Sequence, residues 1–80
     1  MERSEIEAGV KKVASQVLKV PESDIKLEHE FTADLGAASV QSMELVAGFE
    51  EEFDIEMDED EALEVQTVGD AVEFISKYLK

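Results

Sequence analysis

The chain has 80 residues, no cysteine and a formal net charge of −14, from 21 acidic and 7 basic side chains. This length predicts one domain over residues 1–80 with a modest core, too small to enclose a deep enzyme cleft between lobes. The absence of cysteine excludes disulfides, thiolate metal sites and thiol nucleophiles, and so acidic a surface excludes nucleic-acid binding.

No apolar run has the length of a membrane span, and the first residues lack the apolar segment of a signal peptide. We therefore expect a cytoplasmic monomer without stable membrane association.

The acidic side chains are concentrated in one part of the chain. From Leu27 to Ser76, every charged side chain other than His29 is acidic. Such a surface favours association with basic patches on other proteins, weakened by salt. The alternative is that these acids form a solvated face that only keeps the protein soluble.

The first element is predicted to be an amphipathic helix from Ser4 to Lys19. Ser4 and Glu7 have the spacing of a capping box, and Pro21 ends the helix. Apolar residues recur between them at helical intervals, at Ile6, Val10, Val13 and Val17.

A long irregular loop follows, from Pro21 to Ala38. Its apolar residues lack helical spacing and are expected to pin the loop to the core: Ile25, Leu27, Phe31 and Leu35. A structureless loop of this length is uncommon and is usually functional.

Residues Ser39 to Phe53 predict a second helix with two distinct faces. The face expected to be buried comprises Leu45, Val46, Phe49 and Phe53. The other face mixes apolar groups with acids, as a contact surface would: Val40, Met43, Glu44, Ala47 and Glu51. The alternative for Val40 and Met43 is that they pack under the long loop.

The last part of the chain predicts a short helical turn and a final helix. The turn lies between Asp54 and Val65, and Thr67 with Asp70 resembles a capping box. The apolar stripe of the final helix, which ends near Tyr78, comprises Val68, Ala71, Val72, Ile75 and Leu79. We therefore predict an all-α fold, a small four-helix bundle of three main helices and a short third one.

The acidic segment after Phe53 has part of the pattern of a calcium-binding loop. Asp54, Glu56, Asp58 and Asp60 have the odd-position spacing of an EF-hand, but the turn glycine and the bidentate glutamate are replaced by Glu59 and Val65. A calcium module is thus an alternative with an incomplete ligand set, and we expect no dedicated metal site.

No self-contained active site is evident. His29, the single histidine, lies in the irregular loop, and carboxylate pairs are uninformative in so acidic a chain. We expect the protein not to be an enzyme.

Ser39 has two interpretations from its position at a helix start. It is either a plain N-cap, or a serine that bears a phosphate-linked group beside the free N–H groups and positive dipole of the helix.

Four segments closely resemble the acyl carrier proteins of fatty-acid and polyketide synthesis: DLGAASV, MELV, EEEFDIEM and TVGDAV. The similarity covers essentially the whole chain. It implies a four-helix carrier fold and a 4'-phosphopantetheine arm joined through a phosphodiester to Ser39 by a transferase that uses coenzyme A. Acyl groups would be held on the arm as thioesters, and an acyl chain would fold back between the helices.

The resemblance also implies partner-binding acids. Those that match the family are Glu44, Glu50, Glu51 and Glu59, which would meet Arg and Lys patches on the phosphopantetheinyl transferase and on acyl-processing enzymes. With the apolar members of the mixed face, the predicted partner surface comprises Val40, Met43, Glu44, Ala47, Glu50, Glu51 and Glu59.

The chain departs from the usual family pattern around the serine. Ala38-Ser39-Val40 replaces Asp-Ser-Leu, Gln41 replaces a common acid, and Ala47 replaces a larger apolar residue. These departures favour a specialised carrier. The alternative is an unmodified acidic adaptor that binds basic protein surfaces.

Overall fold

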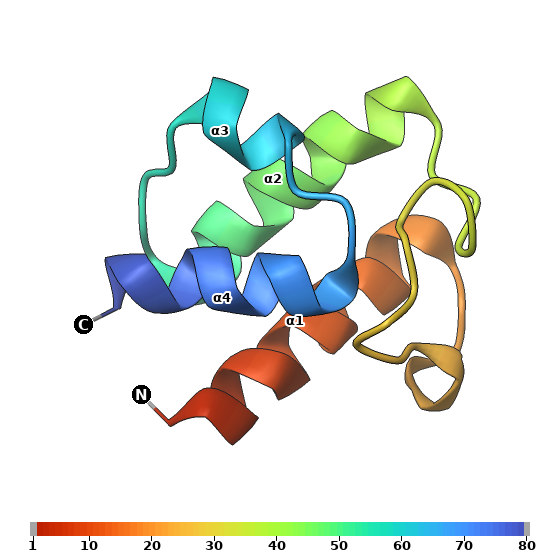
Figure 1. Ribbon diagram of the computed structural model, residues 1–80, viewed down its shortest axis with the longest axis horizontal. Coiled ribbons are helices and arrows are strands. Elements are labelled where there is room, and N and C mark those ends of the chain that lie inside the picture. Colours follow the sequence, from red (N-terminus) through yellow and green to blue (C-terminus); the bar gives the residue numbers. More distant parts are fainter. Residues whose placement is uncertain (1, 80) are drawn as a thin grey trace.

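The protein is described by a computed structural model that covers residues 2–79 (Figure 1). Within these residues it has four α-helices, a 3-10 turn and one isolated β-bridge between Glu30 and Thr67. The helical elements are α1 (Arg3–Leu18), η1 (Glu22–Asp24), α2 (Ser39–Phe53), α3 (Glu59–Leu63) and α4 (Val68–Tyr78). The predicted all-α bundle with a short third helix is therefore confirmed.

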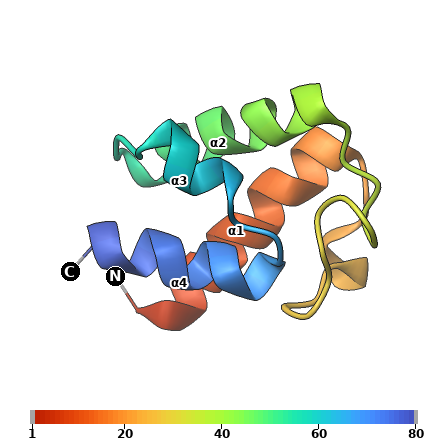
Figure 2. The same ribbon diagram turned by 45° about the horizontal axis from the view of Figure 1, so that its top comes forward.

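Helix α1 packs against both α2 and α4, and α3 packs against α2 (Figures 1 and 2). The core draws on all four α-helices and the long loop. Its largest fully buried side chains are Ile25, Ile75, Val10, Val68 and Val72. Among residues 2–79, none of the helices has the length and apolar character needed to cross a membrane.

The start of α1 differs from the prediction. Its N-cap is Glu2, whose N–H donates to the Glu5 carboxylate at 3.0 Å. Ser4 is already inside the first turn, so the predicted pairing of Ser4 with Glu7 is wrong. At the other end Lys19 is left-handed (φ 58°), and Pro21 follows as predicted.

Two glycines bring α1 and α2 close together. A Cβ at Gly9 would lie 2.5 Å from Cζ of the Phe53 ring, and one at Gly48 would lie 2.6 Å from Cγ1 of Val13. Each helix thus packs a large side chain against the other helix's glycine.

The Gly9→Ala variant is expected to lose about 1–3 kcal/mol of unfolding free energy, because its methyl group overpacks the contact with Phe53. This loss outweighs the higher helix propensity of alanine. Urea denaturation measures it, with Gln16→Ala on the exposed face of α1 as a control expected to stay within about 0.5 kcal/mol. An increase in stability for Gly9→Ala would refute the close packing.

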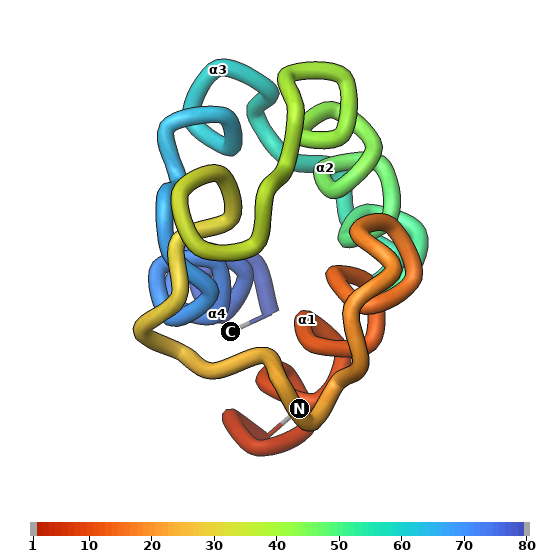
Figure 3. The backbone as a smooth tube through the Cα atoms, turned by 90° about the vertical axis from the view of Figure 1, so that its right-hand side faces the viewer, coloured from red at the N-terminus to blue at the C-terminus, as the bar shows by residue number. Residues whose placement is uncertain are grey.

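The loop between α1 and α2 runs from the end of α1 past the start of α4 to the start of α2 (Figure 3). Ile25 and Phe31 are buried, as predicted, and Leu27 and Leu35 pack against the core. Three backbone hydrogen bonds fasten the loop to the start of α4: Phe31 N–H to Gln66 O (2.9 Å), Val68 N–H to His29 O (3.0 Å) and Gly69 N–H to Leu27 O (2.8 Å). The loop is therefore more ordered than predicted.

Side-chain caps start the last two helices. The Asp58 carboxylate accepts the Glu61 N–H at 3.0 Å, and the Thr67 hydroxyl accepts the Asp70 N–H at 3.0 Å. The second bond confirms the predicted Thr67–Asp70 cap.

Candidate functional site

The last residues of the long loop set the position of the α2 start. The Asp34 carboxylate accepts the Glu30 N–H at 2.8 Å, and the Ala37 N–H donates to the Phe31 carbonyl at 2.8 Å. Gly36 has φ of 74°, a conformation that favours glycine. Because Ala37 is buried, these contacts fix the chain immediately before Ala38 and Ser39, which are both exposed.

Ser39 is not the N-cap of α2. The cap is Ala38, which has extended backbone angles and no side-chain acceptor, and Ser39 is the first helical residue. The alternative in which Ser39 is only a plain N-cap is therefore wrong. The side chain that stabilises the helix start belongs to Gln41 in the first turn, whose oxygen accepts the N–H of the N-cap residue Ala38 at 2.8 Å.

The start of α2 fits an anionic group attached to Ser39. The first N–H groups of a helix have no intrahelical acceptor, and no side chain caps them here. The first turn of α2 contains no acidic residue that would repel an anion. The space beside Gly36 is also open, since a Cβ there would meet nothing within 4 Å.

The other serines are less suited to carry a group. The hydroxyls of Ser42 and Ser76 donate to carbonyls of their own helices, those of Ala38 (3.5 Å) and Val72 (2.7 Å). The remaining serines lie on α1 or η1, and neither element lines the cavity described next.

A cavity of about 210 Å³ lies beside this site, between α2, α3 and α4. Its apolar lining includes Phe31, Leu45, Phe49, Met57, Phe74 and Ile75. Polar residues also line it: Thr32, Ser42 and Gln66. The residues of this lining come from segments far apart in the sequence, so helical periodicity did not identify them as a group.

The mixed face of α2 is exposed, as predicted. Val40 and Met43 are 66% and 54% exposed, which rules out the alternative that they pack under the long loop. Glu44, Ala47 and Glu51 are also exposed. On α3, Leu63 is 45% exposed, although its apolar side chain in the segment after Phe53 was a candidate for burial.

The two other predicted partner-binding acids, Glu50 and Glu59, differ in how exposed their side chains are. Glu59 is exposed at the start of α3. Glu50 is half-buried, and its carboxylate accepts the Met57 N–H at 2.8 Å. Glu50 therefore holds the segment between α2 and α3, a structural role that the sequence analysis missed.

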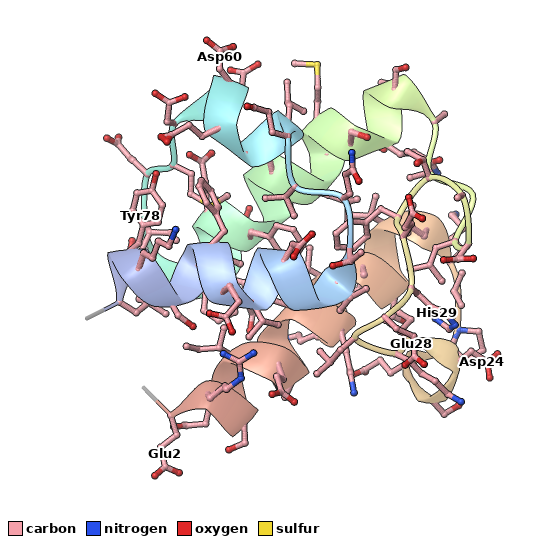
Figure 4. All side chains as sticks on the ribbon, viewed as in Figure 1. Glu2, Asp24, Glu28, His29, Asp60 and Tyr78 are labelled. Carbon is pink, nitrogen blue, oxygen red and sulfur yellow. The ribbon has the colours of Figure 1, made fainter. Side chains whose placement is uncertain are left out.

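The structure offers no catalytic or metal centre at the predicted alternatives. The His29 Nδ1 accepts the Lys26 N–H at 3.2 Å, as in an ordinary loop histidine. In Figure 4, His29 lies far from Asp60 on α3. Across residues 2–79, no three acidic or histidine side chains converge on a position that could hold an ion. The calcium-module alternative thus has no site in this part of the chain.

Comparisons with known proteins agree with the geometry. The family described as "Phosphopantetheine attachment site" matches residues 8–75. Acyl carrier proteins from two Porphyromonas gingivalis strains are 42% identical over 77 residues, which is 96% of this chain and 99% of theirs. The solved structure of the acyl carrier protein from Enterococcus faecalis is similar, with a TM-score of 0.78 and 31% identity, covering 98% of this chain and 99% of that one. A Mycobacterium tuberculosis chain provisionally described as an acyl carrier protein gives a TM-score of 0.82 at 25% identity, covering 90% of this chain and 96% of that one.

Proposed function

Because this chain belongs to the acyl carrier protein family, we propose that Ser39 is the residue to which its 4'-phosphopantetheine arm is attached. The protein is a carrier of acyl intermediates, and its cofactor is the phosphopantetheine arm. The arm supplies the thiol on which acyl groups are held as thioesters, which agrees with a chain that has no cysteine. The chemistry of the acyl groups is left to partner enzymes.

The observation that carries the assignment is the exposed Ser39 at the start of α2, where the first turn has no acid and no side-chain oxygen of the N-cap residue accepts its N–H groups. Its hydroxyl has no capping role to lose when it is esterified. A phosphodiester there would lie near free N–H groups at the positive end of the helix dipole. Tethering makes delivery of the acyl group an intramolecular step, so affinity for each partner can remain weak.

The cavity between α2, α3 and α4 suits the acyl chain. Ser42, on its lining, lies one turn after Ser39 and on the same face of α2. Burial in the apolar part contributes about 0.8 kcal/mol per methylene group. An acyl chain held on the thiol of the arm would therefore be shielded from water while the carrier moves from one partner enzyme to the next.

Interaction with a phosphopantetheinyl transferase and with acyl-processing enzymes follows from the family. We assign the contact to the exposed face of α2 and to α3. Acids on this face, Glu44, Glu51 and Glu59, would meet Arg and Lys side chains, and Val40, Met43 and Ala47 would meet apolar groups. Glu50 would contribute mainly by holding the segment that leads to α3.

The Glu51→Lys and Glu44→Lys variants are each expected to weaken partner binding by about fivefold, because an attractive exposed pair becomes repulsive. The salt dependence of binding should fall as well. Titration against a transferase at two salt concentrations measures both effects. Glu28→Lys, which makes the same charge change on the exposed long loop, is the control. If Glu28→Lys weakens binding equally, net charge and not this surface determines it.

The proposed function is tested by incubating the protein with coenzyme A and a broad-specificity transferase and measuring the intact mass. A gain of one phosphopantetheine, located on the peptide that contains Ser39, is the expected result. Ser42→Ala, one turn away, should gain the same mass. No gain would favour the unmodified adaptor, and a gain on another serine would refute the assignment of Ser39.

A further inference from the structure

We propose that an open groove between α3 and α4 is a docking site for an arginine side chain of a partner protein. The groove has a volume of about 200 Å³ and is lined by Glu61 of α3 and by Phe74, Lys77 and Tyr78 of α4. None of these residues belongs to α2, and the proposal does not depend on modification of Ser39.

Tyr78 is a large exposed side chain that the contact face of α2 does not account for. Val40 and Met43 are exposed on α2, whereas Tyr78 is 38% exposed at the end of α4. Figure 4 shows its side chain beside the segment that leads into α3. An aromatic side chain is therefore open to a partner at a second place on the molecule.

Phe74 and Tyr78 form an aromatic corner in this groove. They are one helical turn apart on α4, their ring centroids are 5.3 Å apart, and the ring planes meet at 70°. In such an edge-to-face pair, the ring that contributes its edge keeps both of its faces free of the other ring. The face of an aromatic ring attracts a cation.

Asp58 fixes the two walls of the groove relative to each other. Its N–H donates to the Tyr78 hydroxyl oxygen at 3.2 Å, and its carboxylate accepts the Glu61 N–H at 3.0 Å. The aromatic wall on α4 is thus connected to the acidic wall on α3. A cation in the groove would contact an aromatic ring and the Glu61 carboxylate together.

The charge around the groove also favours a cation. Of the described residues that line it, only Lys77 is basic, and within residues 2–79 Lys77 makes no ion pair. Its charge stabilises the carboxyl end of the α4 dipole, and its flexible stem allows the ammonium to move aside. Exposed acids lie at and near α3: Asp58, Glu59, Asp60 and Glu64.

A guanidinium suits the groove better than an ammonium does. It is planar and can stack on a ring, and its fork of N–H donors can reach a carboxylate at the same time. An ammonium is a more strongly hydrated point charge. Because the acids extend beyond the groove, a protein surface with further basic side chains fits better than a free small cation.

The test titrates the full chain, with or without the arm, with acetyl-Gly-Ser-Arg-Ser-Gly-amide and with the same peptide containing lysine. Amide NMR shifts of Glu61 and Tyr78 should give about threefold tighter binding of the arginine peptide, as expected for an added stacking contact. At Glu44 and Glu51, on a helix whose two aromatic side chains are buried, the peptides should bind about equally. Equal affinities at the groove, or shifts confined to α2, would overturn the docking site and leave the assignment of Ser39 untouched.

Variants at Tyr78 separate the ring from the hydroxyl. Tyr78→Leu should remove the preference for arginine, whereas Tyr78→Phe should retain it. Both variants lose the bond from the Asp58 N–H, so a difference between them reports the ring. Loss of the preference in both variants would overturn the stacking contact.

Variants of the charged residues test the sign of the ligand. Glu61→Gln should weaken binding of the arginine peptide about threefold, while Glu28→Gln on the long loop should not change it. Lys77→Gln should strengthen binding about twofold, because it removes a like charge. Weaker binding by Lys77→Gln would indicate a site for anions and would overturn the proposal.

Discussion

The Ser39→Ala variant is expected to gain no mass from coenzyme A and transferase, while its unfolding free energy stays within about 0.5 kcal/mol of the unsubstituted protein. Modification is lost because the phosphodiester needs the hydroxyl oxygen. Stability is retained because Ala38 is the N-cap and Gln41 supplies the capping acceptor. Intact mass and urea denaturation measure the two effects separately.

The informative control is Gln41→Ala, which removes the side-chain acceptor of the Ala38 N–H. This variant should lose about 0.5–1 kcal/mol of stability and should still be modified. The capping assignment would be refuted if Ser39→Ala were the more destabilised of the two.

The Phe49→Ala variant is expected to lose about 3–5 kcal/mol of unfolding free energy, the largest effect on stability among the substitutions considered. Phe49 is only 5% exposed, and its ring centroid lies 6.3 Å from that of Phe31. Its removal both forfeits apolar burial and enlarges the existing cavity. The total unfolding free energy of a small domain is about 5–15 kcal/mol. A large fraction of the variant molecules would therefore be unfolded at moderate urea concentration.

Met43→Ala is the matched control for Phe49→Ala, because Met43 is on the same helix but 54% exposed. It should change stability by no more than about 0.5 kcal/mol. Circular dichroism during urea denaturation follows both variants. A loss below about 1 kcal/mol for Phe49→Ala would mean that the ring does not hold α2 to the core.

The helices could be predicted from the sequence because their signals are local. The spacing from Ile6 to Val17 follows the helical period, and Thr67 caps Asp70 three residues later. The exposed face of α2 followed from the same period. The role of Ser39 at the start of α2 was harder to predict, because an N-cap serine and a serine at the first helical position differ by only one residue in sequence.

Features that depend on distant residues could not be predicted in this way. The Glu50 carboxylate accepts the Met57 N–H beyond the end of α2. Helical periodicity cannot predict this contact, because the chain is no longer helical between the end of α2 and Met57. Similarly, the cavity lining combines the long loop, α2, α3 and α4. Loop order depends on hydrogen bonds between residues 27–31 and 66–69, which only the tertiary structure brings together.

The departures from the family pattern around Ser39 have different structural accounts. The structure explains Gln41, because its side-chain oxygen accepts the Ala38 N–H. Val40 lies 66% exposed on the proposed partner surface. Nothing in the structure explains Ala38 in place of the usual aspartate. The combined effect is an α2 start without charge, which leaves the helix dipole uncompensated where the phosphodiester would attach.

The most direct test of Ser39 as the carrier residue is tandem mass spectrometry of the protein isolated from the cells that naturally produce it. We predict one phosphopantetheine per chain, on Ser39, with part of the population bearing acyl groups on its thiol. Protein that is uniformly unmodified in those cells, or that bears the arm on a different residue, would contradict this assignment.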